Sequence, residues 1–136
     1  MSLIVDIKKR LGSFSFSAQL EAGEGVTGIL GSSGCGKSMT LKCIAGIERP
    51  DSGHIELDGV TLFDSEKRIN LPPQKRHVGY LFQNYALFPH MNVAENIGYG
   101  LKLKKVPKSE IRKKVSQMLE LVQLEGYERR KPSELS

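Results

Sequence analysis

The residues that most constrain the fold of this chain are Gly31-Ser32-Ser33-Gly34-Cys35-Gly36-Lys37-Ser38. They fit the pattern Gly-x-x-x-x-Gly-Lys-Ser/Thr, in which a glycine-rich loop joins a strand to a helix and surrounds the phosphates of a nucleotide. The apolar run 26–30 before the loop predicts a short buried strand, and residues 39–45 after it predict a helix that ends at Gly46. The sequence therefore predicts a nucleoside triphosphate site at residues 31–38.

Each residue type in this loop has a physical role in binding phosphate. Backbone N–H groups and the positive end of the following helix attract anions, and glycines at 31, 34 and 36 lack the Cβ atoms that would block a close approach. The Lys37 ammonium can reach the β- and γ-phosphates, and the Ser38 hydroxyl can ligate Mg²⁺. The alternative is a Gly/Ser-rich turn before a helix with one exposed lysine. Agreement between the loop and its flanking elements disfavours that alternative.

The bulk composition sets wider limits. The chain has 136 residues, enough for about one domain, and it contains neither a membrane-spanning apolar run nor the apolar block of a signal peptide. A bridge between its two cysteines, Cys35 and Cys43, would distort the phosphate loop, so free thiols in a reducing cytosol are expected. The net charge of +5 is compatible with nucleic acid or an anionic membrane as a partner and requires neither.

Two antiparallel hairpins are predicted in the first half of the chain. Segments 3–11 and 13–20 alternate apolar and polar residues around Gly12, and segments 54–57 and 60–63 flank Asp58-Gly59, a strong signal for a tight hairpin. Phe14 could stack on an adenine ring, and a half-buried strand aromatic is an equally good interpretation. His54 is interpreted as a surface strand residue, because no second ligand lies at metal-binding spacing.

The second half predicts a loop, a strand and two helices. Polar residues 64–76 predict a loop, and the apolar segment 78–82 predicts a buried strand that ends at Gln83. Asn92 is a plausible N-cap of a helix that carries Val93, Ile97 and Leu101 on one face. A second amphipathic helix should begin at 107–109 and end at Gly126, with apolar residues at Ile111, Val115, Met118, Leu119 and Val122. Its basic first turns oppose the helix dipole and indicate either a solvated face or an anionic partner.

Four segments together resemble the ATPases of ATP-binding-cassette (ABC) transporters. They are 31–38, Tyr80-Leu81-Phe82-Gln83, Leu87-Phe88-Pro89-His90 and Val93-Ala94-Glu95-Asn96-Ile97. Residues 132–136, Pro-Ser-Glu-Leu-Ser, look like the lead-in to that family's signature motif, usually Leu-Ser-Gly-Gly-Gln. The resemblance covers the whole chain, and segment 53–90 is most similar to importer ATPases of the molybdate and sulfate type.

The resemblance implies roles for individual residues. Nucleotide-binding residues would be Ser32, Ser33, Gly34, Cys35, Gly36, Lys37, Ser38 and Met39, with Phe14 in the region of the adenine-stacking aromatic. Ser38 and Gln83 would ligate Mg²⁺, and Lys37 and Gln83 would be the catalytic residues, Gln83 near the attacking water. Met39 stands where the family commonly has threonine, so a hydroxyl contact to the α-phosphate is lost and the backbone N–H remains.

The resemblance also implies partners and a location. Tyr85, Leu87 and Phe88 would form an exposed run that receives the coupling helix of a transmembrane permease subunit, although the residues alone fit a loop packed on its own domain equally well. A second copy of the ATPase subunit would complete the site in the full-length protein. The protein would lie at the cytoplasmic face of the membrane, held there through the permease, and no nucleic acid is expected to bind.

Several family elements are not present in these 136 residues. No apolar run ends in Asp-Glu, so the Walker B aspartate and the catalytic base are missing, as are Gly-Gly-Gln of the signature and the switch histidine. The chain is therefore interpreted as the N-terminal part of an ABC ATPase that binds Mg-ATP without hydrolysing it. The alternatives are a small P-loop kinase, disfavoured by the 54–63 hairpin, and a non-catalytic nucleotide- or nucleic-acid-binding module, which salt dependence would reveal.

The expected fold is an α/β P-loop nucleotide-binding core with an antiparallel β layer and the beginning of a helical subdomain. Residues 1–91 would form the core, with the phosphate loop and Gln83, and residues 92–136 the start of the helical subdomain. The strands at 26–30 and 78–82 are expected to lie in a mainly parallel sheet beside the antiparallel layer.

Overall fold

The computed structural model describes residues 2–83 and 85–135. The chain forms two compact units, Met1–Tyr80 and Leu81–Ser136, and each contains its own hydrophobic core. The expected division of function between residues 1–91 and 92–136 stays a prediction.

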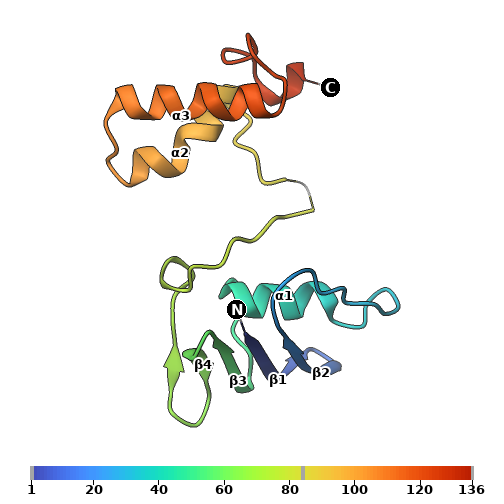
Figure 1. Cartoon of the computed structure of the whole chain (residues 1–136). Coiled ribbons are helices and arrows are strands. Elements are labelled where there is room, and N and C mark those ends of the chain that lie inside the picture. Colours follow the sequence, from blue (N-terminus) through green and yellow to red (C-terminus); the bar gives the residue numbers. More distant parts are fainter. Residues whose placement is uncertain (1, 84, 136) are drawn as a thin grey trace. The chain divides into compact units, whose positions relative to one another are not determined.

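The first unit is an antiparallel sheet with one helix against it (Figure 1). The strands lie in the order β2-β1-β3-β4-β5, and every pairing between neighbours is antiparallel. Their bounds are β1 Leu3–Leu11, β2 Phe14–Ala22, β3 Ser52–Leu57, β4 Val60–Asp64 and β5 Ile69–Asn70. The helix α1, Lys37–Ala45, lies across one face of this sheet.

The core of the first unit lies between α1 and the sheet. In β1 alternate residues point to this face, because successive side chains of a strand lie on opposite sides. In β4 the pairing register shifts at Leu62, so the adjacent Leu62 and Phe63 both contribute. On this face Cys43 and Ile44 of α1 form a single buried cluster with Val5, Ile7, Ile55, Leu62 and Phe63. This packing fixes the helix that follows the phosphate loop onto the sheet.

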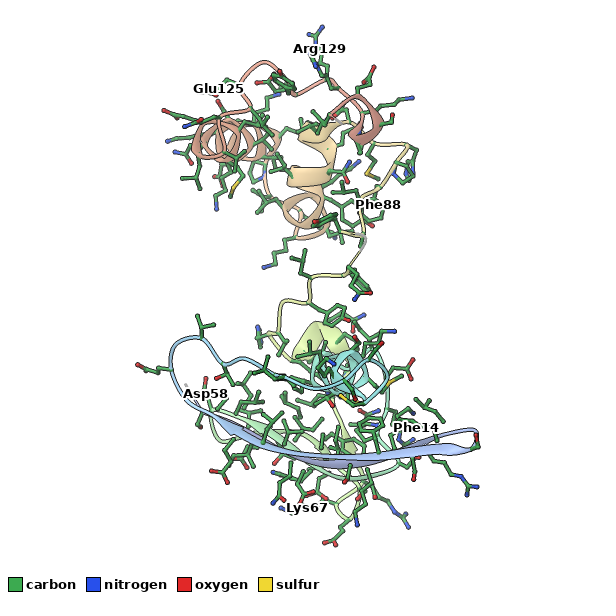
Figure 2. The ribbon with its side chains drawn as sticks, turned by 90° about the vertical axis from the view of Figure 1, so that its right-hand side faces the viewer. Phe14, Asp58, Lys67, Phe88, Glu125 and Arg129 are labelled. Carbon is green, nitrogen blue, oxygen red and sulfur yellow. The ribbon has the colours of Figure 1, made fainter. Side chains whose placement is uncertain are left out.

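Both predicted hairpins are confirmed. β1 pairs with β2 across a turn at Gly12, and β3 pairs with β4 across Asp58 and Gly59, whose φ angles are 50° and 77°. Positive φ at both central residues is the geometry of a type I′ turn, which matches the twist of the flanking strands. Figure 2 shows Asp58 and Phe14 at opposite ends of the sheet.

The two predicted buried strands are absent, and this corrects the expected parallel part of the sheet. Residues 26–30 and 78–82 are irregular, and Val26 and Leu30 are almost fully exposed, at 103% and 95%. A strand is stable only where a neighbour satisfies its N–H and C=O groups, and the described sheet has no strand paired with either segment. Conversely, the predicted loop 64–76 contains β5 and a 3₁₀ turn, η1, at Pro73–Lys75.

The second unit contains a pair of helices, α2 at Val93–Leu103 and α3 at Lys108–Leu121 (Figure 1). Asn92 caps α2 as predicted, and its side chain and that of Glu95 bond each other's backbone N–H groups. The two helices approach closely at Gly98, where an added Cβ would lie 2.9 Å from Cγ2 of Ile111. Val93, Val115 and Leu119 form the core between them.

The predicted end of α3 at Gly126 is wrong. The helix ends at Leu121, and Gln123 takes a left-handed φ of 56°, which reverses the chain so that the Leu124 N–H donates to the carbonyl of Leu119 at 2.9 Å. Met118 and Val122, two of the apolar residues of the predicted amphipathic helix, are about half exposed, at 46% and 51%, and lie outside the core of the second unit. A further 3₁₀ turn, η2, lies at Pro132–Glu134.

Across the described residues, no helix is long and apolar enough to cross a bilayer.

Candidate nucleotide-binding site

The phosphate loop runs directly into the N-terminus of α1. Gly36 is the N-cap, with φ 101°, and Gly34 has φ 81°, so both positions need the left-handed conformations that glycine adopts without strain. An added Cβ at Gly36 would lie 3.0 Å from the ring of Phe16. The loop therefore depends on glycine for its backbone shape and for its contact with β2.

The Lys37 side chain folds back over this loop. Its Nζ donates to the carbonyl oxygens of Gly31 at 2.6 Å and Ser32 at 2.7 Å, and it lies 3.6 Å from Sγ of Cys35. The ammonium is thus held against two backbone carbonyls of the loop. Phosphate oxygens carry negative charge and accept stronger hydrogen bonds than carbonyls do, so this ammonium is placed to exchange the carbonyls for an anion.

The first turn of α1 presents further groups suited to an anion. It carries no acidic residue and no side-chain cap, so its N–H groups and its positive dipole end are not neutralised by the protein. Ser38 is exposed, whereas Met39 is half-buried and packs against the core of the first unit. The Met39 side chain thus has a packing role, and the Ser38 hydroxyl is accessible to a ligand.

Thr40 lies one turn into the helix, and sequence reasoning did not identify it. It is buried, and its hydroxyl donates to the Gly36 carbonyl at 3.0 Å. The Thr40 N–H donates to the same carbonyl at 2.8 Å. Two bonds to the N-cap carbonyl hold the glycine turn against the helix.

Phe14 is connected to the phosphate loop by the ring of Phe16, which lies between them. Phe14 lies on β2 (Figure 2) and is 44% exposed. Its ring stacks on that of Phe16, with ring centroids 6.3 Å apart and planes at 22°. Phe16 in turn lies against the Gly36 position. Phe14 is therefore an exposed aromatic ring that is separated from the phosphate loop by the ring of Phe16. Its stacking on adenine stays a prediction.

A buried arginine supports the opposite end of α1, and it had no signal in the sequence beyond its place in a polar loop. Arg76 is 2% exposed and donates to the carbonyls of Cys43 at 2.7 Å and Ile44 at 3.0 Å. It also donates to the carbonyl of Leu71 and to Oδ1 of Asn70. Burial lowers the pKa of its guanidinium, because removal from water disfavours the charged form.

The other predicted site residues belong to the second unit. Gln83 is exposed, and its role with Mg²⁺ and water stays a prediction. Tyr85 and Leu87 are exposed, at 69% and 52%, whereas Phe88 is partly buried against Tyr99 of α2, with ring centroids 4.5 Å apart. The predicted exposed run is therefore confirmed for two of its three residues.

The side chain of Asn96 anchors this run to α2 at Phe88. Its amide accepts from the Phe88 N–H at 2.9 Å and donates to the carbonyls of Phe88, Met91 and Asn92. One side chain of α2 therefore holds segment 88–92 to the helix, and the Tyr85–Leu87 part projects beyond this anchor.

The two thiols are free, as the sequence predicts. Cys35 is exposed and Cys43 is buried. Within residues 2–83 and 85–135, no group of three or more potential metal-binding side chains is present. His54 instead lies between Asp64 and Glu56, at 3.3 and 3.4 Å.

The glycine loop, the lysine folded over it and the helix behind them have the arrangement of a P-loop. Solved structures with the same fold include a bacterial ABC transporter cassette in dimeric form, with a TM-score of 0.72 and 24% identity over all of this chain and 63% of that one. A dimeric ATP-binding cassette with bound ADP and phosphate has a TM-score of 0.71 and 23% identity over the same shares. At these identities the likeness concerns the fold.

The family follows from sequence comparison. The family model described as "ABC transporter" matches residues 14–136, and the chain belongs to this family. It is 42% identical to the molybdenum import ATP-binding protein ModC of Paramagnetospirillum magneticum, over 98% of this chain and 36% of the relative. It is 48% identical to the spermidine/putrescine import ATP-binding protein PotA of Haemophilus influenzae (96% and 34%) and 46% identical to the sulfate/thiosulfate import ATP-binding protein CysA of Gloeobacter violaceus (100% and 39%). The chain thus spans between a third and two fifths of the length of these relatives.

Proposed function

We propose that residues 31–38 bind the phosphates of ATP together with Mg²⁺, and that the chain supplies this site to the ATP-binding subunit of an ABC importer. The observation that carries the proposal is the position of the Lys37 ammonium, 2.6 and 2.7 Å from two loop carbonyls at the uncapped N-terminus of α1. A cation, a helix N-terminus and glycines in one loop form a site for a polyanion.

The residues present also suit Mg²⁺. The metal prefers oxygen ligands and retains several waters, and it is usually held by one or two protein groups together with substrate phosphates. The exposed Ser38 hydroxyl at the start of α1 meets that need beside the loop. Gln83 is proposed as the second protein ligand, through its amide oxygen.

The site is tested by titrating a fluorescent ATP analogue with and without Mg²⁺. Lys37→Ala should weaken binding by about ten- to a hundredfold, the loss expected for charge-assisted hydrogen bonds to phosphate. Lys75→Ala removes an exposed lysine from η1 and is the matched control, for which affinity should be unchanged. Equal affinity of Lys37→Ala and the parent chain would exclude the loop as the phosphate site.

Metal binding has a separate measurement. Ser38→Ala should reduce the gain in affinity that Mg²⁺ gives while leaving metal-free nucleotide binding within about twofold. If the gain from Mg²⁺ is the same in Ser38→Ala as in the parent chain, Ser38 is not a ligand.

The activity and substrate of the whole protein are further parts of the proposal. We propose ATP hydrolysis by the full-length protein and none by residues 1–136, because phosphoryl transfer also needs an activated water and charge stabilisation. All three relatives are named as import proteins, which supports an importer. Two of these names concern molybdenum and sulfate and one concerns polyamines, so a small anion such as molybdate or sulfate is the narrower proposal.

The second unit is proposed as the contact with a membrane-embedded permease. Tyr85 and Leu87 project beyond the Asn96 anchor, and a groove of about 810 Å³ lies between α2 and α3, with Gly98, Ile111 and Val115 among its lining residues. An apolar groove of this kind fits one face of an amphipathic helix. The proposed subunit would lie at the cytoplasmic face of the membrane and form a dimer with a second copy.

A further inference from the structure

The positive charge of the chain is concentrated in the link between α2 and α3. Residues 102–114 contain seven basic side chains and one carboxylate, Glu110, a net charge of +6. The whole chain has a net charge of +5, so the remaining residues together carry −1. The cations of this segment, named here the basic link, are Lys102, Lys104, Lys105, Lys108, Arg112, Lys113 and Lys114.

The cations of the basic link are all exposed. Within the residues that the structure describes, none of the seven side chains takes part in a hydrogen bond or an ion pair. The charge is therefore neutralised only by solvent ions and is accessible to an external anion.

This charge arrangement is unfavourable for the helix that carries it. α3 begins after Pro107, which gives no side-chain cap, and its first turn holds one cation, Lys108, and one carboxylate, Glu110. The next turn adds Arg112, Lys113 and Lys114 near the positive end of the helix dipole. Lys108 and Arg112 are also four residues apart, a spacing at which like charges repel. A nearby anionic surface would reverse both effects.

The cations surround the end of the helical pair and do not line one face. Successive residues of an α-helix are rotated by about 100°, so Arg112, Lys113 and Lys114 point in three different directions around the axis. Figure 1 shows the link at one end of the second unit, with the segment after α3 at the other end. Such an arrangement fits contact of the tip with an extended anionic plane.

An exposed apolar residue lies among these charges. Leu103, the last residue of α2, is 66% exposed between Lys102 and Lys104. Nucleic-acid backbones offer no apolar layer for such a side chain, whereas a bilayer places hydrocarbon just beneath its charged headgroups. Basic residues around an exposed leucine are the combination that favours binding to a membrane surface.

We propose that the basic link docks on anionic lipid headgroups, with its cations at the phosphates and Leu103 inserted toward the acyl chains. The inference concerns a different surface from the phosphate loop and does not depend on nucleotide binding.

Co-sedimentation of the 136-residue chain with lipid vesicles tests this inference. The chain should bind vesicles containing about 30% phosphatidylglycerol and bind pure phosphatidylcholine vesicles at least tenfold more weakly, and added salt should release it. Lys104→Gln/Lys105→Gln/Lys113→Gln should weaken binding to the anionic vesicles about a hundredfold, since each basic residue near such a surface contributes about fivefold. These three lysines are exposed and lie outside the groove between the helices, so the fold should be retained.

The matched control is Lys8→Gln/Lys75→Gln/Lys131→Gln, which removes the same charge from exposed positions elsewhere and should change affinity less than threefold. Leu103→Ser, with every cation in place, should weaken binding about tenfold through the lost apolar contact. Equal losses in the two triple variants would overturn the inference. A second result would also overturn it: binding to duplex DNA that is abolished in the basic-link triple variant and unchanged in Leu103→Ser. That result would assign the surface to nucleic acid.

Discussion

Nη1 of Arg76 lies 2.7 Å from the carbonyl oxygen of Cys43, in the last turn of α1. This helix begins at Lys37, directly after the phosphate loop. The last carbonyls of a helix have no partner within it and carry the negative end of its dipole. Here a buried cation from a distant segment donates to two of them, the carbonyls of Cys43 and Ile44, and backbone N–H groups after the helix supply further bonds. The two ends of α1 are therefore treated differently. The phosphate loop leaves the positive N-terminal end open to solvent, and Arg76 neutralises the negative C-terminal end.

Replacing Arg76 should be among the most destabilising changes in the first unit. Arg76→Met keeps much of the side-chain volume and leaves the carbonyls of Cys43, Ile44 and Leu71 without this partner in a buried site. We expect a loss of about 3 kcal/mol in the free energy of unfolding, measured by urea titration. Lys75→Met, at an exposed neighbouring position, removes the same charge and should change stability by less than about 0.5 kcal/mol. A similar effect for both variants would show that charge, not the buried contacts, is responsible.

Gly46 is predicted to be sensitive for a related reason. It ends α1 with φ 79°, and an added Cβ would lie 2.5 Å from Nε of Arg76. Gly46→Ala therefore combines a left-handed alanine, which costs about 1–2 kcal/mol, with a clash against a fixed side chain, and about 3 kcal/mol should be lost.

Gly126→Ala separates these two effects. Gly126 has a similar φ of 85° and open space around its Cβ position, so only the backbone cost should remain. Thermal unfolding of the two variants gives the comparison. If Gly126→Ala is as destabilising as Gly46→Ala, the contact with Arg76 contributes nothing.

The features predicted correctly from the sequence are those that local chemistry determines. The glycine turn before α1, the Asp58–Gly59 turn and the Asn92 cap each depend on backbone geometry within a few residues, and each is found where the residue types require it. The helix pair followed from apolar periodicity. Local rules did not locate the end of α3, because a left-handed Gln123 ends it before the glycine that was expected to do so.

The features that were missed depend on distant partners. Residues 26–30 have the composition of a buried strand, but a strand also needs a neighbour, and sequence periodicity does not indicate whether one is present. Arg76 was assigned to a polar loop because nothing near it in the chain reveals the carbonyls of Cys43 and Ile44, more than thirty positions away. The anchoring of Phe88 by Asn96 is a contact of the same kind across eight residues.

The two cysteines should react at very different rates. Cys35 is exposed in the phosphate loop, whereas burial raises the pKa of the Cys43 thiol to about 11. At pH 8 only about one Cys43 thiol in a thousand would be ionised, and the thiolate is the reactive form. An aromatic disulfide reagent should therefore label one thiol quickly in the folded chain and both in urea. Cys35→Ser should remove the fast phase, and a fast phase that persists in this variant would show that Cys43 is accessible.

Stability in acid should depend on Asp64. Its carboxylate accepts hydrogen bonds from the backbone N–H groups of Lys67 at 2.8 Å and Glu66 at 2.9 Å and lies 3.3 Å from the His54 ring. The bond from Lys67 is the largest of the effects that lower the pKa of this carboxyl below its ordinary value of 3.8. The stabilisation is therefore complete above that value and is lost as the pH falls through the lower pKa of the folded state.

The measurement is the free energy of unfolding at pH 7 and at several values below pH 4. Asp64→Asn should lower stability at neutral pH and show a smaller loss on acidification than the parent chain, because the group that takes up the proton is gone. Glu21→Gln removes an exposed carboxylate from β2 of the same sheet and is the matched control. It should leave the acid dependence near that of the parent chain. If Asp64→Asn loses as much stability between pH 7 and pH 3 as the parent does, other carboxylates account for the acid sensitivity of the sheet.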